Sequence, residues 1–251
     1  MYCGIVLGNE PRQTQTAVCL EQLGARLADA GPLDFLVLPM GCEELPEQMT
    51  ELKSRGVCFG IHPGTAVKSH ARERGIRLVD LNELPAFKRR NAVATAEAAL
   101  ALAVGNTKGT LFGAQVLVIG FGAIGSRLCR LLTALGAKVT GTARKSEDLV
   151  QIVLEGCRAV HTEALAQTAR PYNVVFNTVP APVLTQSLLD RLPGDCLILD
   201  LASDDGGRCL GAAHKNYIQA LALPGKTAPL AAAQAAADTI WDKLEELYAG
   251  K

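Results

Sequence analysis

The stretch VLVIGFGAIGSRL, residues 116–128, constrains the fold more than any other part of the chain. It joins a continuous apolar run to a leucine-rich helical pattern through Gly120, Gly122 and Gly125, in the spacing G-x-G-x-x-G. The first glycine permits a tight turn, the second lets a pyrophosphate approach the backbone, and the third lets the helix pack closely on the strand. The pattern predicts a dinucleotide whose phosphates rest on a helix N-terminus, with a purely structural glycine turn as the alternative.

The sequence around this motif alternates short aliphatic runs with amphipathic helical segments. Parallel strands that are joined by right-handed helical crossovers produce this alternation. We therefore predict a doubly wound, Rossmann-type α/β domain over residues 91–229. Its expected strands are 114–120, 137–143, 158–161, 172–180, 196–203 and 218–225, and its expected helices include 91–106, 126–136, 146–156, 184–192 and 209–216.

The first 90 residues repeat the alternation in a reduced form, which predicts a smaller N-terminal α/β domain of the flavodoxin-like kind. Helices are expected near residues 12–29, 43–54 and 65–74. The final segment, 230–251, is a long helical pattern that we expect to pack back on this first domain. The predicted domains are therefore 1–90, joined by 230–251, and 91–229.

Composition excludes several classes of function. Lysine plus arginine equal aspartate plus glutamate at 25 each, and aromatic residues make up only 4%, so nothing indicates nucleic-acid binding. We find no secretory pattern and no membrane-spanning apolar run, and we expect a soluble, cytoplasmic protein. The eight cysteines are scattered singly, which favours reduced thiols over disulfides or a metal site, so no metal is predicted.

The segment after the second predicted Rossmann strand departs from the usual pattern. An acid that binds the adenosine ribose is expected about 20 residues after the glycines. The chain instead places Ala143, Arg144, Lys145 and Ser146 there, before Glu147 and Asp148. Cations and a hydroxyl suit a 2′-phosphate, so we predict NADP(H) in preference to NAD(H). A solvated basic turn is the alternative.

Polar residues also follow two later strands, at the sheet edge where open α/β sheets bind ligands. Asn177 and Thr178 are expected to border the nicotinamide ribose, or else to form an ordinary strand-to-helix cap. Asp200 could orient a water or the substrate, or cap a helix. The predicted cofactor-binding residues are Gly120, Phe121, Gly122, Ala123, Ile124, Gly125, Ala143, Arg144, Lys145, Ser146, Asn177, Thr178, Val179, Pro180 and Ala202.

Five ordered segments carry a resemblance to a known family. RRNAVATAEAALALA, GAQVLVIGFGAIGSRLCRLLTALGAKVTGTAR, FNTVPAPVLT, LILDLASDDGG and LPGKTAP, between about residues 88 and 235, resemble the dinucleotide-binding A subunit of dipicolinate synthase. More loosely, the glycine motif resembles D-2-hydroxyacid dehydrogenases and adenosylhomocysteine hydrolase, which usually carry the acid that is missing here. Relative to the family, the first domain looks shortened, and Asp204-Asp205 stand where a basic or neutral residue and a proline are usual.

The resemblance implies an oxidoreductase of sporulation that oxidises a dihydrodipicolinate-type cyclic dicarboxylate to dipicolinate with NADP+. It also implies a flavoprotein-like partner, the B subunit of dipicolinate synthase, and we expect a homo-oligomer. Three alternatives remain. They are another NAD(P)-dependent dehydrogenase, an NAD-using hydrolase, and a non-catalytic NADPH-binding subunit.

The family segment with threonine and glutamate in the interdomain helix maps onto Thr95 and Glu97, beside Asn91, which are expected to face a cleft. A dicarboxylate requires paired donors or cations, and loss of a ring proton requires a base. Glu97 is expected to act as that base or to anchor a cation. The predicted catalytic residues are His62, Asn91, Thr95, Glu97, Ser203 and Lys226.

Overall fold

The computed structural model describes residues 1–167, 171–202, 207–209 and 211–249. The chain divides into two compact units. Unit 1 comprises Met1–Asn91 and Pro224–Lys251, and unit 2 comprises Ala92–Leu223. Each unit holds one parallel sheet, as predicted for a two-domain α/β fold.

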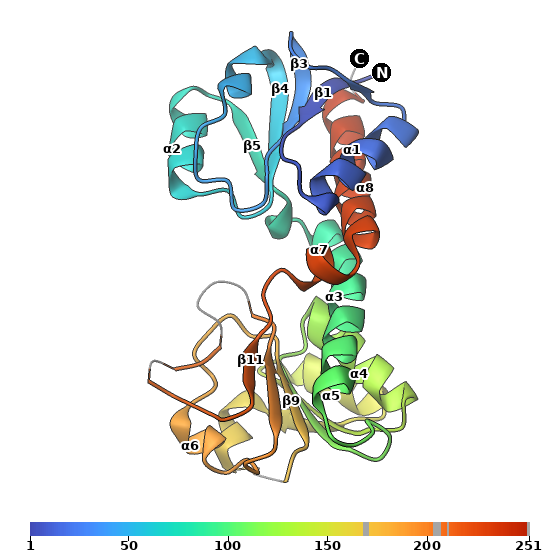
Figure 1. The fold of residues 1–251 in the computed structure, drawn as a ribbon, viewed down its shortest axis with the longest axis vertical. Helices are drawn as coiled ribbons and strands as arrows, with labels where there is room; N and C mark the ends of the chain where they lie inside the picture. Colours follow the sequence, from blue (N-terminus) through green and yellow to red (C-terminus); the bar gives the residue numbers. More distant parts are fainter. Residues whose placement is uncertain (168–170, 203–206, 210, 250–251) are drawn as a thin grey trace. The chain divides into compact units, whose positions relative to one another are not determined.

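The sheet of unit 1 has five parallel strands in the order β2-β1-β3-β4-β5 (Figure 1). This is the order of flavodoxin-like folds, in which the strand sequence reverses direction between β1 and β3. The strands are β1 (Cys3–Val6), β2 (Arg26–Leu27), β3 (Leu33–Val37), β4 (Leu52–Gly60) and β5 (Arg77–Asp80).

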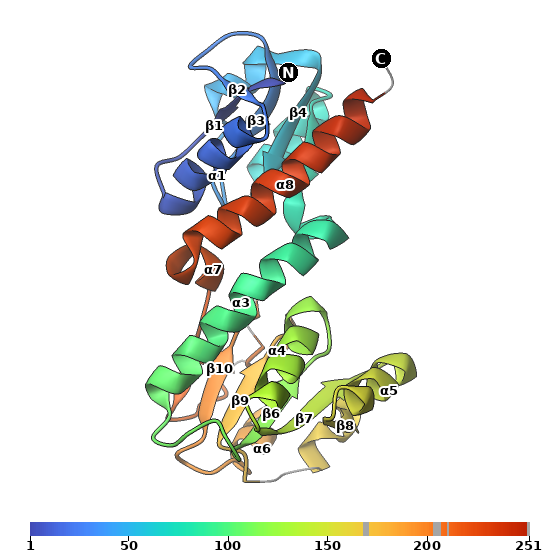
Figure 2. The ribbon, with the colours of Figure 1, turned by 90° about the vertical axis from the view of Figure 1, so that its right-hand side faces the viewer.

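Helices cover both faces of this sheet. On one face α1 (Pro11–Gln22) packs beside α8 (Pro229–Tyr248) (Figure 2). Leu20, Phe35 and Ile240 share one buried cluster there. On the other face α2 (Thr65–Glu73) contributes to a second cluster. The predicted C-terminal helix is therefore part of the core of unit 1.

One helix prediction for unit 1 was too long at its C-terminal end, and another was wrong. Helix α1 ends at Gln22 because Gly24, at φ +105°, turns the chain and the Ala25 amide bonds to the Leu20 carbonyl. Arg26–Leu27 then pairs with β1 as β2. The predicted helix 43–54 is a single 3-10 segment, η1 (Glu47–Glu51), since Pro46 disfavours a helical residue before it and β4 begins at Leu52.

The sheet of unit 2 has six parallel strands in the order β11-β10-β9-β6-β7-β8. Counted from β6, this is the Rossmann order 3-2-1-4-5-6, which confirms the predicted doubly wound sheet. The strands are β6 (Gln115–Ile119), β7 (Lys138–Ala143), β8 (Arg158–His161), β9 (Val174–Asn177), β10 (Leu197–Asp200) and β11 (Tyr217–Gln219).

Helices pack on both faces of this sheet as well. One face is covered by α3 (Pro85–Asn106), whose buried alanines include Ala96 and Ala99, together with α4 (Ala123–Ala134) and α5 (Ser146–Leu154). The other face carries η3 (Thr162–Gln167) and α6 (Gln186–Leu189), through Leu165 and Leu188. The short elements η2 (Leu81–Glu83) and α7 (Leu223–Thr227) belong to the connections.

The predicted helix 209–216 does not form in the described residues. Gly211 adopts φ +77°, and the side chain of Gln186 accepts the Ala213 amide, so a side chain satisfies a backbone group that a helix would have paired. The strand predicted over 218–225 is also shorter, since β11 ends at Gln219 and α7 begins at Leu223. None of the described helices combines the length and the apolar character needed to cross a membrane.

Candidate functional site

The first glycine of the motif forms a tight turn at the end of β6. Gly120 has φ +92°, a conformation that L side chains rarely adopt. A Cβ there would lie 2.7 Å from the Thr178 hydroxyl oxygen and from Val179. The Gly120 amide donates to the Thr142 hydroxyl at 3.2 Å, so the turn is fixed from the neighbouring strand.

The other two glycines have different environments. A Cβ added at Gly122, the N-cap of α4, would meet nothing within 4 Å among the described residues, whereas one at Gly125 would lie 2.1 Å from the Gly120 carbonyl oxygen. No described side chain caps α4, and its first turn contains no acid. The amides of Ala123 and Ile124 therefore have no intrahelical acceptor and can bind an anion at the open face beside Gly122. Phe121 and Ile124 pack against the core behind the turn.

The loop after β9 lies against this turn. The Thr178 hydroxyl donates to the Ile119 carbonyl at 2.9 Å, and its oxygen would be 3.2 Å from a Cβ at Gly125. Val179 is half-buried and Pro180 is exposed. The structure thus brings the predicted residues 120–125 and 178–180 together at the carboxyl edge of the sheet.

The end of β7 carries exposed cations in place of an acid. Ala143 is buried, whereas Arg144, Lys145 and Ser146 are exposed. Glu147 and Asp148 lie in the first turn of α5, as the sequence predicts. Among the described residues no side chain pairs with the Arg144 guanidinium, so it is available to a ligand.

His161, at the end of β8, supports this segment from the adjacent strand. Its Nε2 lies 3.0 Å from the Arg144 carbonyl oxygen, and the Glu163 amide lies 3.4 Å from its Nδ1. In the neutral ring, Nδ1 then accepts and Nε2 donates to Arg144. Sequence reasoning missed this residue because the contact joins His161 and Arg144, which are 17 residues apart in the chain.

Asn177 is a core residue and not an open ligand contact. It is fully buried, its Nδ2 donates to Asp200 at 2.8 Å and to the Val179 carbonyl at 3.2 Å, and its Oδ1 accepts the Val179 amide. The cap alternative was wrong, since the next helix begins at Gln186 and is capped by Thr185. Asn177 instead fixes the loop that lies over the glycine turn.

Asp200 is also fully buried, and it accepts four hydrogen bonds from the described residues. The donors are Asn177 Nδ2, the Ala202 amide at 3.2 Å, the Gly207 amide at 2.6 Å and the Tyr217 hydroxyl at 2.6 Å. Burial, and then this hydrogen bond to Asp200, raise the pKa of Tyr217. The carboxylate therefore holds the loops after β9 and β10 to β11. Ser203 and Asp204-Asp205 lie outside the described residues.

Thr95 and Glu97 do not form one constellation. They are two residues apart in α3, a spacing that places side chains on different faces of a helix. Thr95 is 6% exposed, whereas Glu97 lies among the exposed residues of the chain. The structure therefore separates the two residues that the family pattern groups.

The remaining predicted catalytic residues belong to unit 1. His62 is exposed just after β4 with φ +52°, a strained conformation for a residue with a Cβ, and its ring contacts Asn82. Lys226 is exposed in α7. Asn91 accepts a hydrogen bond at 3.3 Å from Arg12, a buried cation that sequence reasoning missed.

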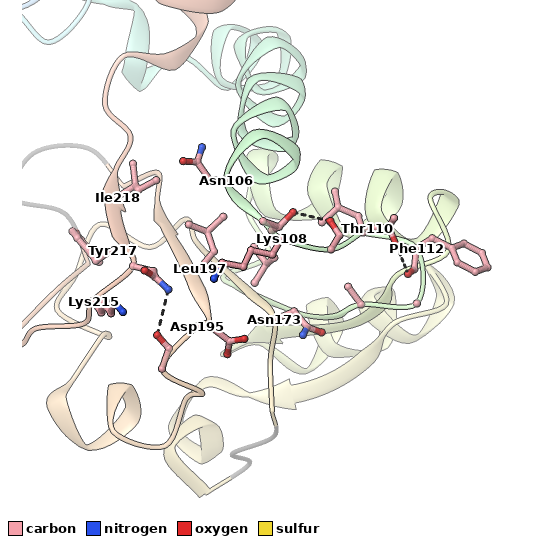
Figure 3. A pocket seen from close by; sticks show the side chains of 18 residues that line it. Asn106, Lys108, Thr110, Phe112, Asn173, Asp195, Leu197, Lys215, Tyr217 and Ile218 are labelled. Carbon is pink, nitrogen blue, oxygen red and sulfur yellow. Dashed lines mark hydrogen bonds between the residues drawn. The ribbon is translucent and has the colours of Figure 1, made fainter.

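One cavity of unit 2 lies away from the glycine turn. Figure 3 shows this cavity from close by. Its volume is about 940 Å³, and its lining includes Thr110, Asn173, Asp195 and Asn216. These residues precede β6, β9, β10 and β11, so the cavity opens at the amino edge of the sheet. Ligands of open α/β sheets bind at the carboxyl edge, where the glycine turn lies, and this cavity is at the opposite edge.

Comparison with known proteins places these features in a family. The NAD binding domain of D-isomer specific 2-hydroxyacid dehydrogenases matches residues 90–192, which include the glycine turn and Arg144. The A subunit of dipicolinate synthase from Bacillus subtilis (strain 168) is 33% identical over 186 residues, 73% of this chain and 62% of that protein. The chain belongs to the dipicolinate synthase A-subunit family. At 62%, the aligned part spans less than two thirds of the length of the Bacillus subtilis (strain 168) protein.

Solved structures of the same family extend the match. The Bacillus halodurans A subunit superposes with a TM-score of 0.90 at 26% identity and covers 97% of both chains. The Bacillus subtilis protein superposes with a TM-score of 0.89, also at 26% identity, over 100% of this chain and 98% of the other. Unit 2 is therefore a nicotinamide-dinucleotide-binding domain of this family.

Proposed function

We propose that this protein is an NADP(H)-dependent oxidoreductase that oxidises a dihydrodipicolinate-type cyclic dicarboxylate to dipicolinate. The observation that carries the proposal is the glycine turn at the end of β6 together with Arg144 at the end of β7, which has no side-chain partner among the described residues. The family supports the choice of substrate, because two members of known structure are A subunits of dipicolinate synthase.

The oxidation removes two electrons and two protons from the ring and makes it aromatic. Bound NADP+ supplies the acceptor for the hydride. In our proposal the open backbone at Gly122 and the N-terminus of α4 hold the pyrophosphate, and Arg144 with Lys145 and Ser146 holds the 2′-phosphate. The remaining proton requires a base, for which the exposed His62 and Glu97 are the candidates.

Cofactor choice is tested by fluorescence titration with NADPH and NADH. Arg144→Ala should weaken NADPH binding about 10- to 100-fold, because a charged donor to the 2′-phosphate is lost. NADH binding should change by no more than about twofold, since NADH lacks that phosphate. The matched control is Lys138→Ala, an exposed cation at the opposite end of β7. Equal loss for both nucleotides, or no loss for NADPH, contradicts the assignment.

His161→Ala should weaken NADPH binding by about threefold, because the Arg144 backbone loses one hydrogen bond of ordinary strength. His214→Ala is its control. His214 makes the same pair of contacts, from Nε2 to the Pro193 carbonyl and from the Asn216 amide to Nδ1, but near the amino edge of the sheet. A loss of NADPH affinity in both variants would point to a general effect on unit 2.

Turnover is tested by following reduced-nicotinamide absorbance with dihydrodipicolinate and NADP+, with and without a flavoprotein-like second subunit, which we propose as the partner. Appearance of NADPH together with dipicolinate supports the proposed function. Tight NADPH binding without turnover under either condition supports a non-catalytic NADPH-binding subunit. Turnover of a 2-hydroxy acid in place of dihydrodipicolinate would move the protein to the dehydrogenases matched by residues 90–192.

A further inference from the structure

Arg12 is a buried cation that forms no ion pair in the described part of the chain, although the carboxylate of nearby Glu10 raises the pKa that burial lowers. It is 7% exposed, and no carboxylate among the described residues forms an ion pair with it. One terminal nitrogen lies 3.9 Å from the Met40 sulfur, the other lies 3.3 Å from Asn91 Oδ1, and Nε has no hydrogen-bond partner among those residues. A guanidinium has five N–H donors, so most of its capacity is unused there.

Such an arrangement costs stability, because a buried charge needs a counter-charge or several hydrogen bonds. Burial lowers the pKa of Arg12 to about 10, which still leaves the side chain charged at neutral pH. The packing of Phe87 against Arg12 does not supply the missing hydrogen bonds either. The guanidinium carbon lies 5.7 Å from the centre of the Phe87 ring, a cation–π contact that satisfies no N–H group.

The position of Arg12 in the sheet is the one at which ligands of such folds bind. It lies in the first turn of α1, directly after β1, and Met40 follows β3. The strand order reverses between β1 and β3, and crevices for ligands form at this point, at the carboxyl ends of the strands. The contact between Arg12 and Met40 therefore joins the two sides of the switch point.

The turn that carries Arg12 is held rigidly. Gln13 Nε2 donates to the Leu7 carbonyl at 2.9 Å and to the Leu38 carbonyl at 2.7 Å, so one buried amide ties the ends of β1 and β3 together. The backbone at Gly8 adopts φ +100° beside it. A site for a small ligand requires this kind of fixed support for its binding residue.

We propose that Arg12 is the carboxylate-binding residue of unit 1 and that its ligand is a carboxylate group of the small organic acid on which the enzyme acts. The planar fork of a guanidinium matches the two oxygens of a carboxylate, and the free Nε is part of that fork. The apolar Phe87 and Met40 beside it suit the carbon skeleton of an organic acid better than a hydrated inorganic ion. This inference rests on the proposed function for the identity of the acid.

The test is calorimetric titration of the full chain with dipicolinate, in the presence and absence of NADPH. Arg12→Met, of similar length and without charge, should weaken dipicolinate binding by about tenfold or more and leave NADPH affinity unchanged. The matched control is Arg72→Met, which replaces an exposed arginine of α2. This variant should bind dipicolinate and NADPH with the same affinities as the unsubstituted protein. Dipicolinate binding that survives Arg12→Met overturns the inference, as does an equal loss of NADPH affinity.

If Arg12→Met does not fold, as judged by circular dichroism, the Arg12→Lys variant tests the inference instead. Lysine keeps the charge and lacks the fork, so dipicolinate should bind at least about fivefold more weakly, and equal binding overturns the inference. Competition by inorganic phosphate as strong as that by dipicolinate would also overturn it. Arg12-dependent binding of pyridine-2-carboxylate or malonate, without binding of dipicolinate, supports the carboxylate site and overturns the proposed substrate.

Discussion

Replacing Asp200 with alanine should lower the free energy of unfolding by about 3 kcal/mol or more, because four donors lose their acceptor inside the core. Two of these donors are the backbone amides of Ala202 and Gly207, at 3.2 and 2.6 Å from the carboxylate. Urea unfolding followed by far-UV circular dichroism measures the change. Asp195→Ala, which removes an exposed acid just before the same strand, should change stability by no more than about 0.5 kcal/mol.

The same substitution should alter the response to alkaline pH. Because the pKa of Tyr217 is raised in the folded protein, its contribution to stability is present below the ordinary pKa of tyrosine, about 10. That contribution is lost as pH rises toward the higher folded value. Without Asp200 the folded pKa falls toward the ordinary one, so the alkaline loss should become smaller. Unfolding curves at several pH values check this, and an unchanged alkaline slope would contradict the role of the hydrogen bond.

A methyl group added at Gly125 should mainly lower stability, whereas one added at Gly122 should mainly weaken NADPH binding. Gly125→Ala places a Cβ 2.1 Å from the Gly120 carbonyl oxygen, so α4 must move off β6, and we expect a loss of about 2–4 kcal/mol. Gly122→Ala meets open space and should cost only about 0.5–1 kcal/mol as an N-cap change. Its methyl group would lie where the pyrophosphate approaches, so NADPH affinity should fall by about tenfold or more.

Urea unfolding and NADPH titration on both variants separate these effects. Hydrogen exchange of the peptides that contain β6 and α4 locates the destabilisation in Gly125→Ala. Gly122→Ala with full NADPH affinity would contradict the binding role of the open backbone. Gly125→Ala with unchanged stability would contradict the close packing of helix and strand.

Features that depend on neighbours in the chain could be predicted from the sequence. The turn at Gly120, the presence of a helix after the glycines and the acids in the first turn of α5 follow from local backbone conformation and local periodicity. The doubly wound sheet also follows, because strands and helices of suitable length alternate. The two-residue strand β2 could not be found, since pairing with β1 and not its own sequence defines it.

Side-chain environments at strand ends were predicted less well. Asn177 and Asp200 occupy the positions where ligand-binding groups are expected, but their partners come from each other and from loops far along the chain. The local sequence around Arg12, just after Pro11, predicts an ordinary exposed residue. Arg12 is a buried cation only because Phe87 and Met40 pack around it. Thr95 and Glu97 share a helix, and their burial differs because of the rotation of about 100° per residue.

The place of α8 in the core of unit 1 bears on the order in which the two units can be completed during synthesis. Ile240 and Leu244 fill that core together with Leu20 and Phe35, so one wall of unit 1 is missing until those late residues have left the ribosome. Unit 2 is continuous from Ala92 to Leu223 and has all its strands by then. Since domains fold as units, the cofactor-binding half should be finished first, although its chain starts second.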